Sequence, residues 1–189
     1  MPRPAILPLL DWQVVFSSGL EYQAWLDGAE SPEQRGKLET QRQALQLEPQ
    51  VIGHLAALPR TVRVLAIAED WCGDVVRHVP VLQRLAEVAP NLRVRYVNRQ
   101  QWPELFARFL TNGGEAIPKF IFLSEAWVEC GNWGPMPEIC REFIARGKAC
   151  GDVAAARKQV SAHYEADGQR RAVVTELLHM IDIASTLAV

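Results

Sequence analysis

The spacing of apolar residues changes along the chain and separates a helical start from a mixed centre. In the first sixty residues apolar positions recur at helical intervals, which predicts helices over 18–28, 31–47 and 48–58. Ser18 is a candidate N-cap for the first of these helices, because serine at that place can accept a backbone N–H of the first turn. The first part of the chain is therefore predicted to be all helical.

The pattern becomes strand-like at residue 61. Residues 61–68 are short, β-branched and nearly free of charge, which predicts a strand buried on both faces. A helical period follows over 74–89, and residues 92–98 then alternate between apolar and polar side chains, which predicts a strand nearer a sheet edge. The remaining predicted elements are a helix over 103–110, strands over 117–123 and 126–133 joined as a hairpin, and helices over 136–147, 150–166 and 169–187.

This order of elements predicts an α/β fold. A right-handed crossover makes the first two strands a parallel pair, and the hairpin adds an antiparallel edge, which gives a four-stranded mixed sheet flanked by helices. We divide the chain into a helical N-terminal extension (1–60), a core (61–148) and a C-terminal helical extension (149–189). The apolar faces of the extensions either cover the sheet or pair two subunits into a homodimer.

Composition narrows the classes of function. The chain has 189 residues, of which 49% are hydrophobic, and a net charge of −2 with acids and bases mixed, so we expect no nucleic acid partner. The longest apolar stretch is interrupted by Glu176, His179 and Asp182, so we expect no membrane partner. The first twelve residues hold three prolines and Asp11 and do not resemble a signal peptide, which favours a cytoplasmic protein.

The four cysteines are Cys72, Cys130, Cys140 and Cys150, and no CxxC pair occurs. We expect reduced thiols rather than disulfides, and neither a metal site nor a bound cofactor, because the four histidines are scattered. All four are assigned to structural roles, and His54, His163 and His179 are expected to lack partners. Cys140 lies on the apolar face of its predicted helix and is assigned to packing, and Cys130 is assigned to the hairpin strand.

Three motifs stand in a characteristic order: EDWCGD after the first strand, GGEAIPKFIFL leading into the third, and GNWGPMPE after the hairpin. With the order of elements, they make residues 60–147 resemble the thioredoxin fold. More narrowly, they are similar to a bacterial branch of thioredoxin-like proteins that carries a helical N-terminal extension.

The resemblance implies a role for each matched position. Cys72 matches the attacking thiol at a helix N-terminus, and Pro118 matches the cis-proline that faces it. Trp71 matches the tryptophan that flanks the thiol, and Gly73 and Asp74 occupy the middle of the motif and are assigned with Trp71 to substrate binding.

Ile117, just before the proline, is expected to offer its free backbone N–H and C=O to an extended partner chain. Lys119 is expected to point to solvent. The turn Trp133-Gly134-Pro135 is expected to bury its indole, with a place at the rim of the site as the alternative.

Two positions depart from the thioredoxin pattern. Val75 stands where the second, resolving cysteine is found, and Ala66 replaces a buried acid six residues before Cys72. A lone thiolate can attack a disulfide, but it needs a second thiol to release the product. That thiol comes from glutathione or another low-molecular-weight thiol, from a partner, or from a distant cysteine, of which Cys150 is the best internal candidate.

Two electrostatic effects on the pKa of Cys72 oppose each other. Helix N-termini lower a cysteine pKa, whereas the neighbouring Glu69, Asp70 and Asp74 disfavour an anion. We predict a modestly lowered pKa. The favoured function is a monothiol thiol-disulfide oxidoreductase acting on protein or small-molecule disulfides, and the alternative is a redox-inactive module that binds peptides on the same scaffold.

Overall fold

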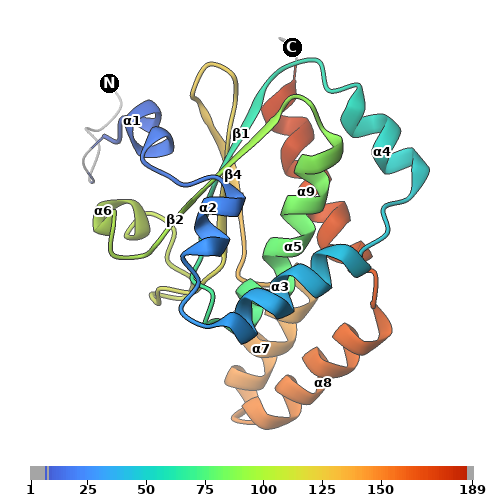
Figure 1. Ribbon diagram of the computed structural model, residues 1–189. Coiled ribbons are helices and arrows are strands. Elements are labelled where there is room, and N and C mark those ends of the chain that lie inside the picture. Colours follow the sequence, from blue (N-terminus) through green and yellow to red (C-terminus); the bar gives the residue numbers. More distant parts are fainter. Residues whose placement is uncertain (1–6, 8, 187–189) are drawn as a thin grey trace.

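A four-stranded mixed sheet forms the centre of the computed structural model, which describes residue 7 and residues 9–186 (Figure 1). Its strands are β1 (Val62–Ile67), β2 (Leu92–Val97), β3 (Lys119–Leu123) and β4 (Glu129–Trp133). They lie in the order β2-β1-β3-β4, with β1 parallel to β2 and antiparallel to β3, and with β3 antiparallel to β4. The sheet predicted from the pattern of strands is confirmed, including the edge position of β2.

The two central strands are the most deeply buried. Every residue of β1 except Arg63 is buried, and every residue of β3 is buried. A run of apolar, β-branched residues is favoured in such a strand, because helices cover the sheet on each side and bury the side chains of both faces.

The helices surround this sheet (Figure 1). They are α1 (Trp12–Ser17), α2 (Tyr22–Asp27), α3 (Pro32–Ala44), α4 (Pro49–Ala56), α5 (Gly73–Val88), α6 (Pro103–Phe106), α7 (Glu138–Cys150), α8 (Val153–Ala166) and α9 (Arg171–Ser185). In Figure 1, α1 and α6 lie to one side of the sheet and α5 and α9 to the other, while α7 and α8 pack together at one end. None of the helices in the described residues is long and apolar enough to cross a lipid bilayer.

The start of the chain differs from the prediction. Ser18 does not open a helix: it is the C-cap of α1, whose N-terminus is capped by the carboxylate of Asp11 at 3.0 Å from the N–H of Gln13. The next helix begins only at Tyr22, because Leu20 exchanges backbone hydrogen bonds with Tyr96 of β2 and is extended.

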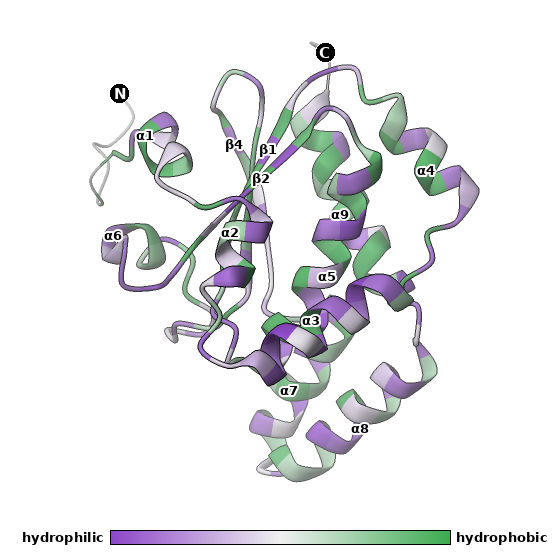
Figure 2. Cartoon of the chain, viewed as in Figure 1, coloured by the Kyte–Doolittle hydropathy of each residue, from purple (hydrophilic) through white to green (hydrophobic). Residues whose placement is uncertain are grey.

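The C-terminal extension supplies part of the sheet's cover. Helix α9 contacts β4, β3, β1 and α5, and its Leu177 and Ile181 are fully buried. In Figure 2, α9 carries broad hydrophobic segments, whereas α3 is largely hydrophilic. The apolar face of α9 therefore covers the sheet.

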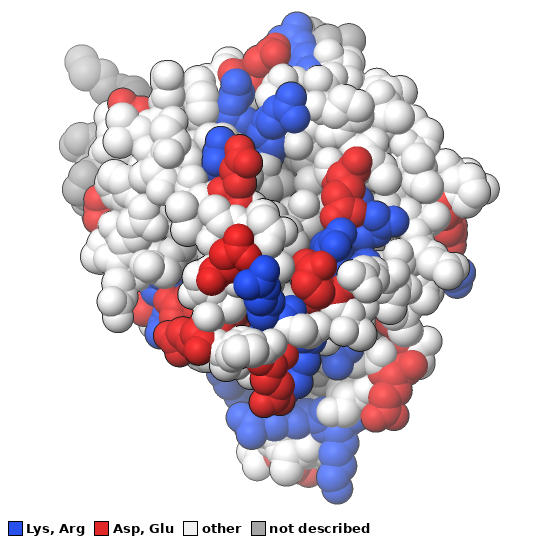
Figure 3. Space-filling model, viewed as in Figure 1, with Lys and Arg blue, Asp and Glu red and all other residues white. Residues whose placement is uncertain are grey.

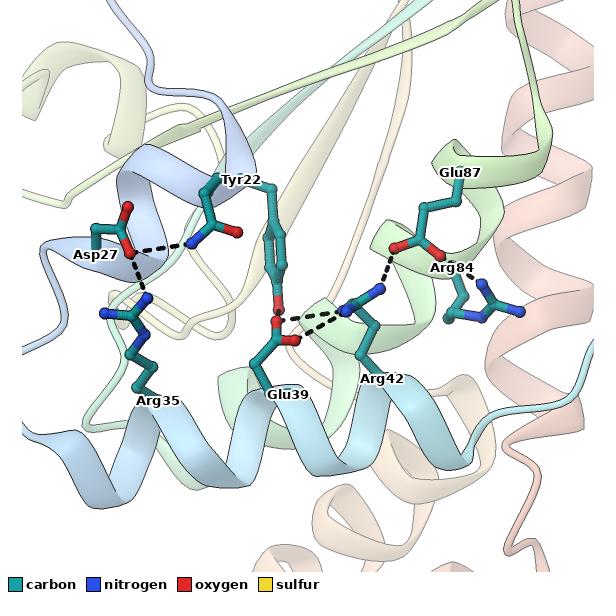
Figure 4. A network of polar contacts seen from close by, with 8 residues as sticks. Tyr22, Asp27, Arg35, Glu39, Arg42, Arg84 and Glu87 are labelled. Atoms are coloured by element: carbon teal, nitrogen blue, oxygen red, sulfur yellow. Dashed lines mark hydrogen bonds and ion pairs between the residues drawn. The ribbon is translucent and has the colours of Figure 1, made fainter.

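A polar network joins the N-terminal helices to the core (Figure 4). Arg42 of α3 donates to Glu39 at 2.8 Å and to Glu87 of α5 at 2.6 Å. Tyr22 of α2 donates to the same Glu39 at 3.2 Å, and its pKa is raised by burial and by the Glu39 charge. Three helices thus share one set of charge-assisted hydrogen bonds, which fixes α2 and α3 against α5.

Candidate thiol site

Cys72 lies where the chain turns from the sheet into α5. It is the N-cap of that helix, with extended backbone angles, and its carbonyl accepts the first helical bond from the N–H of Val76 at 3.0 Å. Its half-buried Sγ donates to the carbonyl oxygen of Ile117 at 3.5 Å. The Ile117–Pro118 peptide bond is cis. The structure thus brings together the thiol and the isoleucine-proline pair, which lie far apart in the sequence.

The predicted lowering of the Cys72 pKa is wrong. Burial raises the pKa of the Cys72 thiol above its usual value, and the backbone N–H groups of Val75 and Asp74 only partly oppose it. The negative charge of Asp74 adds to the rise, and Arg99 lowers it slightly. The effects of the helix terminus and of the neighbouring acids on this pKa were expected from the sequence, but the desolvation of a half-buried sulfur is the largest effect.

Trp71 is the exposed member of the motif. Its side chain is 47% exposed, and its indole N–H donates to Glu69 at 2.7 Å. The guanidinium of Arg99 lies 5.1 Å from the ring centroid and also donates to Glu69 at 3.1 Å. Arg99, which the sequence motif did not identify, therefore balances the charge of Glu69, while Trp71 remains largely exposed next to Cys72 in the chain.

The N-terminal extension holds the loop that carries this motif. Asp70 is buried and accepts the backbone N–H of Glu30 at 2.8 Å. The indole N–H of Trp25 donates to the carbonyl of Ala68 at 3.3 Å. Because both bonds cross between distant segments, the helices before the core help to position the thiol loop.

Asp74 belongs to a network that reaches the C-terminal extension. The hydroxyl of Tyr164, from α8, lies 3.5 Å from Asp74 Oδ1 and 3.2 Å from Nε2 of His78. Burial raises the pKa of Asp74, and the charge of Arg77 and the hydrogen bond from Tyr164 partly oppose this rise. His78 is fully buried and its pKa lies well below the usual value because burial disfavours the cation. The neutral ring packs edge-on against Trp133 at 5.3 Å, which fits the structural role expected of it.

Lys119, expected in solvent, is buried instead. Its side chain is 3% exposed, and Nζ donates to Thr111 Oγ1 at 3.0 Å and to the carbonyl of Gly134 at 3.1 Å. Burial and the nearby Arg141 lower its pKa to about 8. Every position of β3 is covered, so the lysine has no route to water along that strand.

The turn after the hairpin packs directly against the proline loop. Trp133 is buried, stacks on Phe120 at 5.3 Å and donates to Glu176 of α9 at 2.5 Å. Gly134 has φ +120°, and a Cβ there would lie 2.1 Å from the carbonyl oxygen of Pro118. Only glycine permits this approach. The buried indole is as expected, and the turn also borders the proline loop.

The other cysteines lie in different surroundings. Cys140 is fully buried and its pKa is raised to about 11, so it is a packing residue as expected. Cys130 is on β4, and its Sγ donates to the carbonyl of Val128 at 3.3 Å. Cys150 is the exposed last residue of α7 rather than the start of the next helix, because Gly151 ends α7 in a left-handed conformation.

Like His78, His54 has a partner that the sequence did not predict. His54 Nε2 lies 2.6 Å from Asp182 of α9, so it is not partnerless as expected. In the part of the chain that the structure describes, no group of three or more His, Cys, Asp or Glu side chains could hold a metal ion.

The comparisons with known proteins place this fold in a family. A family model described as Thioredoxin matches residues 19–156, and the chain therefore belongs to this thioredoxin family. No curated protein matches the sequence.

Two solved structures show the same fold. One is a protein of unknown function from Pseudomonas aeruginosa, 19% identical, with a TM-score of 0.73 over 92% of this chain and 98% of that chain. The other is an HIV epitope scaffold, 20% identical, with a TM-score of 0.64 over 79% of this chain and 99% of that chain.

The sequence patterns did not predict the positions of three residues near the site. The burial of Lys119 was signalled by its place in an unbroken apolar run. Arg99 and Tyr164 gave no such signal, because each reaches the site from a different element across tens of residues of sequence.

Proposed function

We propose that the protein is a monothiol thiol-disulfide oxidoreductase in which Cys72 is the attacking thiol. The observation that carries this proposal is the position of Cys72 Sγ at the start of α5, 3.5 Å from the carbonyl of Ile117 beside Pro118. Cys72 is half-buried, adjoins the exposed Trp71 in the chain, and its sulfur is approached by the first-turn N–H groups that stabilise an anion.

The chemistry follows from a single thiolate. The thiolate of Cys72 attacks one sulfur of a disulfide, forms a new S–S bond and expels the other sulfur as a thiolate, which takes a proton from solvent. A second thiol then attacks Cys72 and releases the product. Val75, which is fully buried on the first turn of α5, stands where a second cysteine would supply that thiol. The second thiol therefore comes from a low-molecular-weight thiol such as glutathione, from the substrate, or from Cys150.

The neighbouring residues have binding roles in this proposal. Ile117 presents its backbone to an extended substrate by β-augmentation, and Trp71 with Gly73 forms the exposed rim. Pro118 shapes the loop opposite the thiol, and Asp74 lies beside the substrate and influences the charge on Cys72 through its own carboxylate.

The raised pKa of Cys72 favours one alternative function. If burial keeps the thiol protonated at neutral pH, the site binds extended peptides without redox chemistry. In that case the replacement of Cys72 by alanine leaves partner binding unchanged.

Turnover of a glutathionylated peptide in the presence of glutathione tests the proposal. We expect turnover by the natural chain and none by Cys72→Ser. The variant Val75→Cys supplies a second thiol in the first turn of α5, and it should reduce insulin faster than the natural chain. Absent turnover together with no gain from Val75→Cys would exclude the redox role.

A further inference from the structure

Two adjoining cavities, which together we call the groove, lie near the thiol site. They have volumes of about 450 Å³ and about 500 Å³, and they share Met136, Ile144 and Lys148 in their linings. The first reaches Ala116, the residue before Ile117, and the second reaches Asp74, two residues after Cys72. The groove therefore runs from the residue before the proline loop across α7 to the first turn of α5, and Cys72 itself does not line it.

The floor of the groove is apolar and is built by α7 and α8. Met136, Ile144, Val153 and Val160 line it. The two helices approach closely at Gly147, where a Cβ would lie 2.4 Å from the Cβ of Ala156. Because α8 belongs to the C-terminal extension, this floor is made partly by residues outside the predicted core.

The cations along the groove outnumber the available anions. Arg141, Lys148 and Arg157 line it, and within the described residues Lys148 and Arg157 are exposed and make no ion pair. Glu142 is engaged by Arg146 at 3.5 Å. Figure 3 shows Lys and Arg side chains exposed over the part of the surface where α7 and α8 lie.

The two other carboxylates on the groove, Asp74 and Glu138, offset the charge of the three cations only in part. Asp74 accepts a hydrogen bond from the hydroxyl of Tyr164 and is partly buried rather than open to a partner. Glu138, at the first turn of α7, is exposed and lies near the positive end of the helix dipole. Unpaired cations over an apolar floor favour a partner that carries acidic side chains next to apolar ones.

We propose that this groove binds an acidic, extended segment of the polypeptide whose disulfide Cys72 attacks. The inference rests on the proposed redox function for its substrate and adds the substrate's chemistry. The bond changes are those of disulfide exchange: an S–S bond forms between Cys72 and the substrate cysteine while the substrate's S–S bond breaks. Over the full cycle, two external thiols are oxidised to a disulfide and the disulfide of the substrate is reduced to two thiols.

The test compares two cysteine peptides that differ only in charge. Both carry the cysteine as a mixed disulfide with 2-mercaptoethanol, which is neutral, and one has Asp and Glu where the other has Asn and Gln. The rate constant for disulfide exchange with the full chain is measured at low salt. We expect the acidic peptide to react about fivefold to tenfold faster, because a few partly exposed charge pairs each contribute modestly.

Charge-reversal variants locate the effect. Arg157→Glu and Lys148→Glu should each remove most of the preference for the acidic peptide. Lys158→Glu is the matched control, because it is exposed on the same helix and changes the net charge equally but does not line the groove. The preference should survive in this control.

The outcomes distinguish acidic docking in the groove from the proposed redox function. Equal rates for both peptides, or a preference unchanged in Arg157→Glu and Lys148→Glu, overturn acidic docking while the redox function stands. No exchange with either peptide removes the redox function. In that event, fluorescence anisotropy with the Cys72→Ser variant tests the docking separately. Tighter binding of the acidic peptide that is lost when Arg157→Glu is added supports acidic docking, and equal binding of the two peptides overturns it.

Discussion

Lys119 gives the sharpest prediction about stability, because a lysine is buried in the central strand beside the proline loop. Its Nζ donates to Thr111 and Gly134, and its pKa falls from 10.5 to about 8. The perturbation is Lys119→Met, which keeps an unbranched chain of similar length and removes the ionisable group.

The pH dependence follows from the difference between the two pKa values. Between pH 8 and pH 10.5 the folded lysine has lost its proton while the unfolded lysine still holds it, so the folded state gains stability as pH rises. A shift of about 2.5 units corresponds to about 3 kcal/mol of unfolding free energy across that window. A neutral amine still has two N–H groups for its two acceptors.

Urea unfolding of the natural chain and of Lys119→Met, from pH 7 to pH 10.5, measures this directly. The free energy of unfolding of the natural chain should rise relative to the variant by about 3 kcal/mol, with most of the change above pH 8. Ionisation of Tyr22 and other tyrosines affects both chains equally and cancels in the difference. Parallel pH profiles for the two chains would refute the buried-lysine argument.

Three further predictions concern the site and its supports. Gly134→Ala should destabilise the fold by several kcal/mol or prevent folding, since a Cβ would clash with the proline carbonyl, whereas Gly168→Ala meets nothing within 4 Å and should be tolerated. Asp74→Asn should lower the pKa of Cys72, because the Asp74 charge raises it, and the pH midpoint of iodoacetamide alkylation should move down. Tyr164→Phe should cost about 1–3 kcal/mol in urea unfolding, because it leaves buried polar partners unsatisfied.

Each of these has a contrary result. Equal stability of the two alanine variants would show that the turn does not approach the proline loop. An unchanged or higher alkylation midpoint in Asp74→Asn would mean that the carboxylate does not act on the thiol. Full stability of Tyr164→Phe would remove the hydroxyl network as a link between α5 and α8.

The sheet and the meeting of the motifs were predictable because each depends on a short stretch of sequence. The apolar run of β1 and the alternation of β2 gave strand type and place, and the resemblance placed Cys72 opposite Pro118. Lys119 was misplaced because the charge of one residue was weighed above the burial of its strand.

The remaining differences come from contacts between distant residues. The pKa of Cys72 depends on how deeply the loops bury it, which no local pattern states. The link from Asp74 to Tyr164 and the groove shared by α7 and α8 depend on how the C-terminal helices pack. Periodicity identifies those helices but does not determine which residues they bring to the site.

The central claim is that Cys72 alone attacks a disulfide and depends on another thiol for release. Incubation of the folded chain with 2-hydroxyethyl disulfide, followed by intact mass and peptide mapping, tests it most directly. We predict one adduct on Cys72 that forms in the native state and is removed when an outside thiol is added. An unmodified Cys72 in the folded chain, together with a modified Cys72 after unfolding, would contradict the claim.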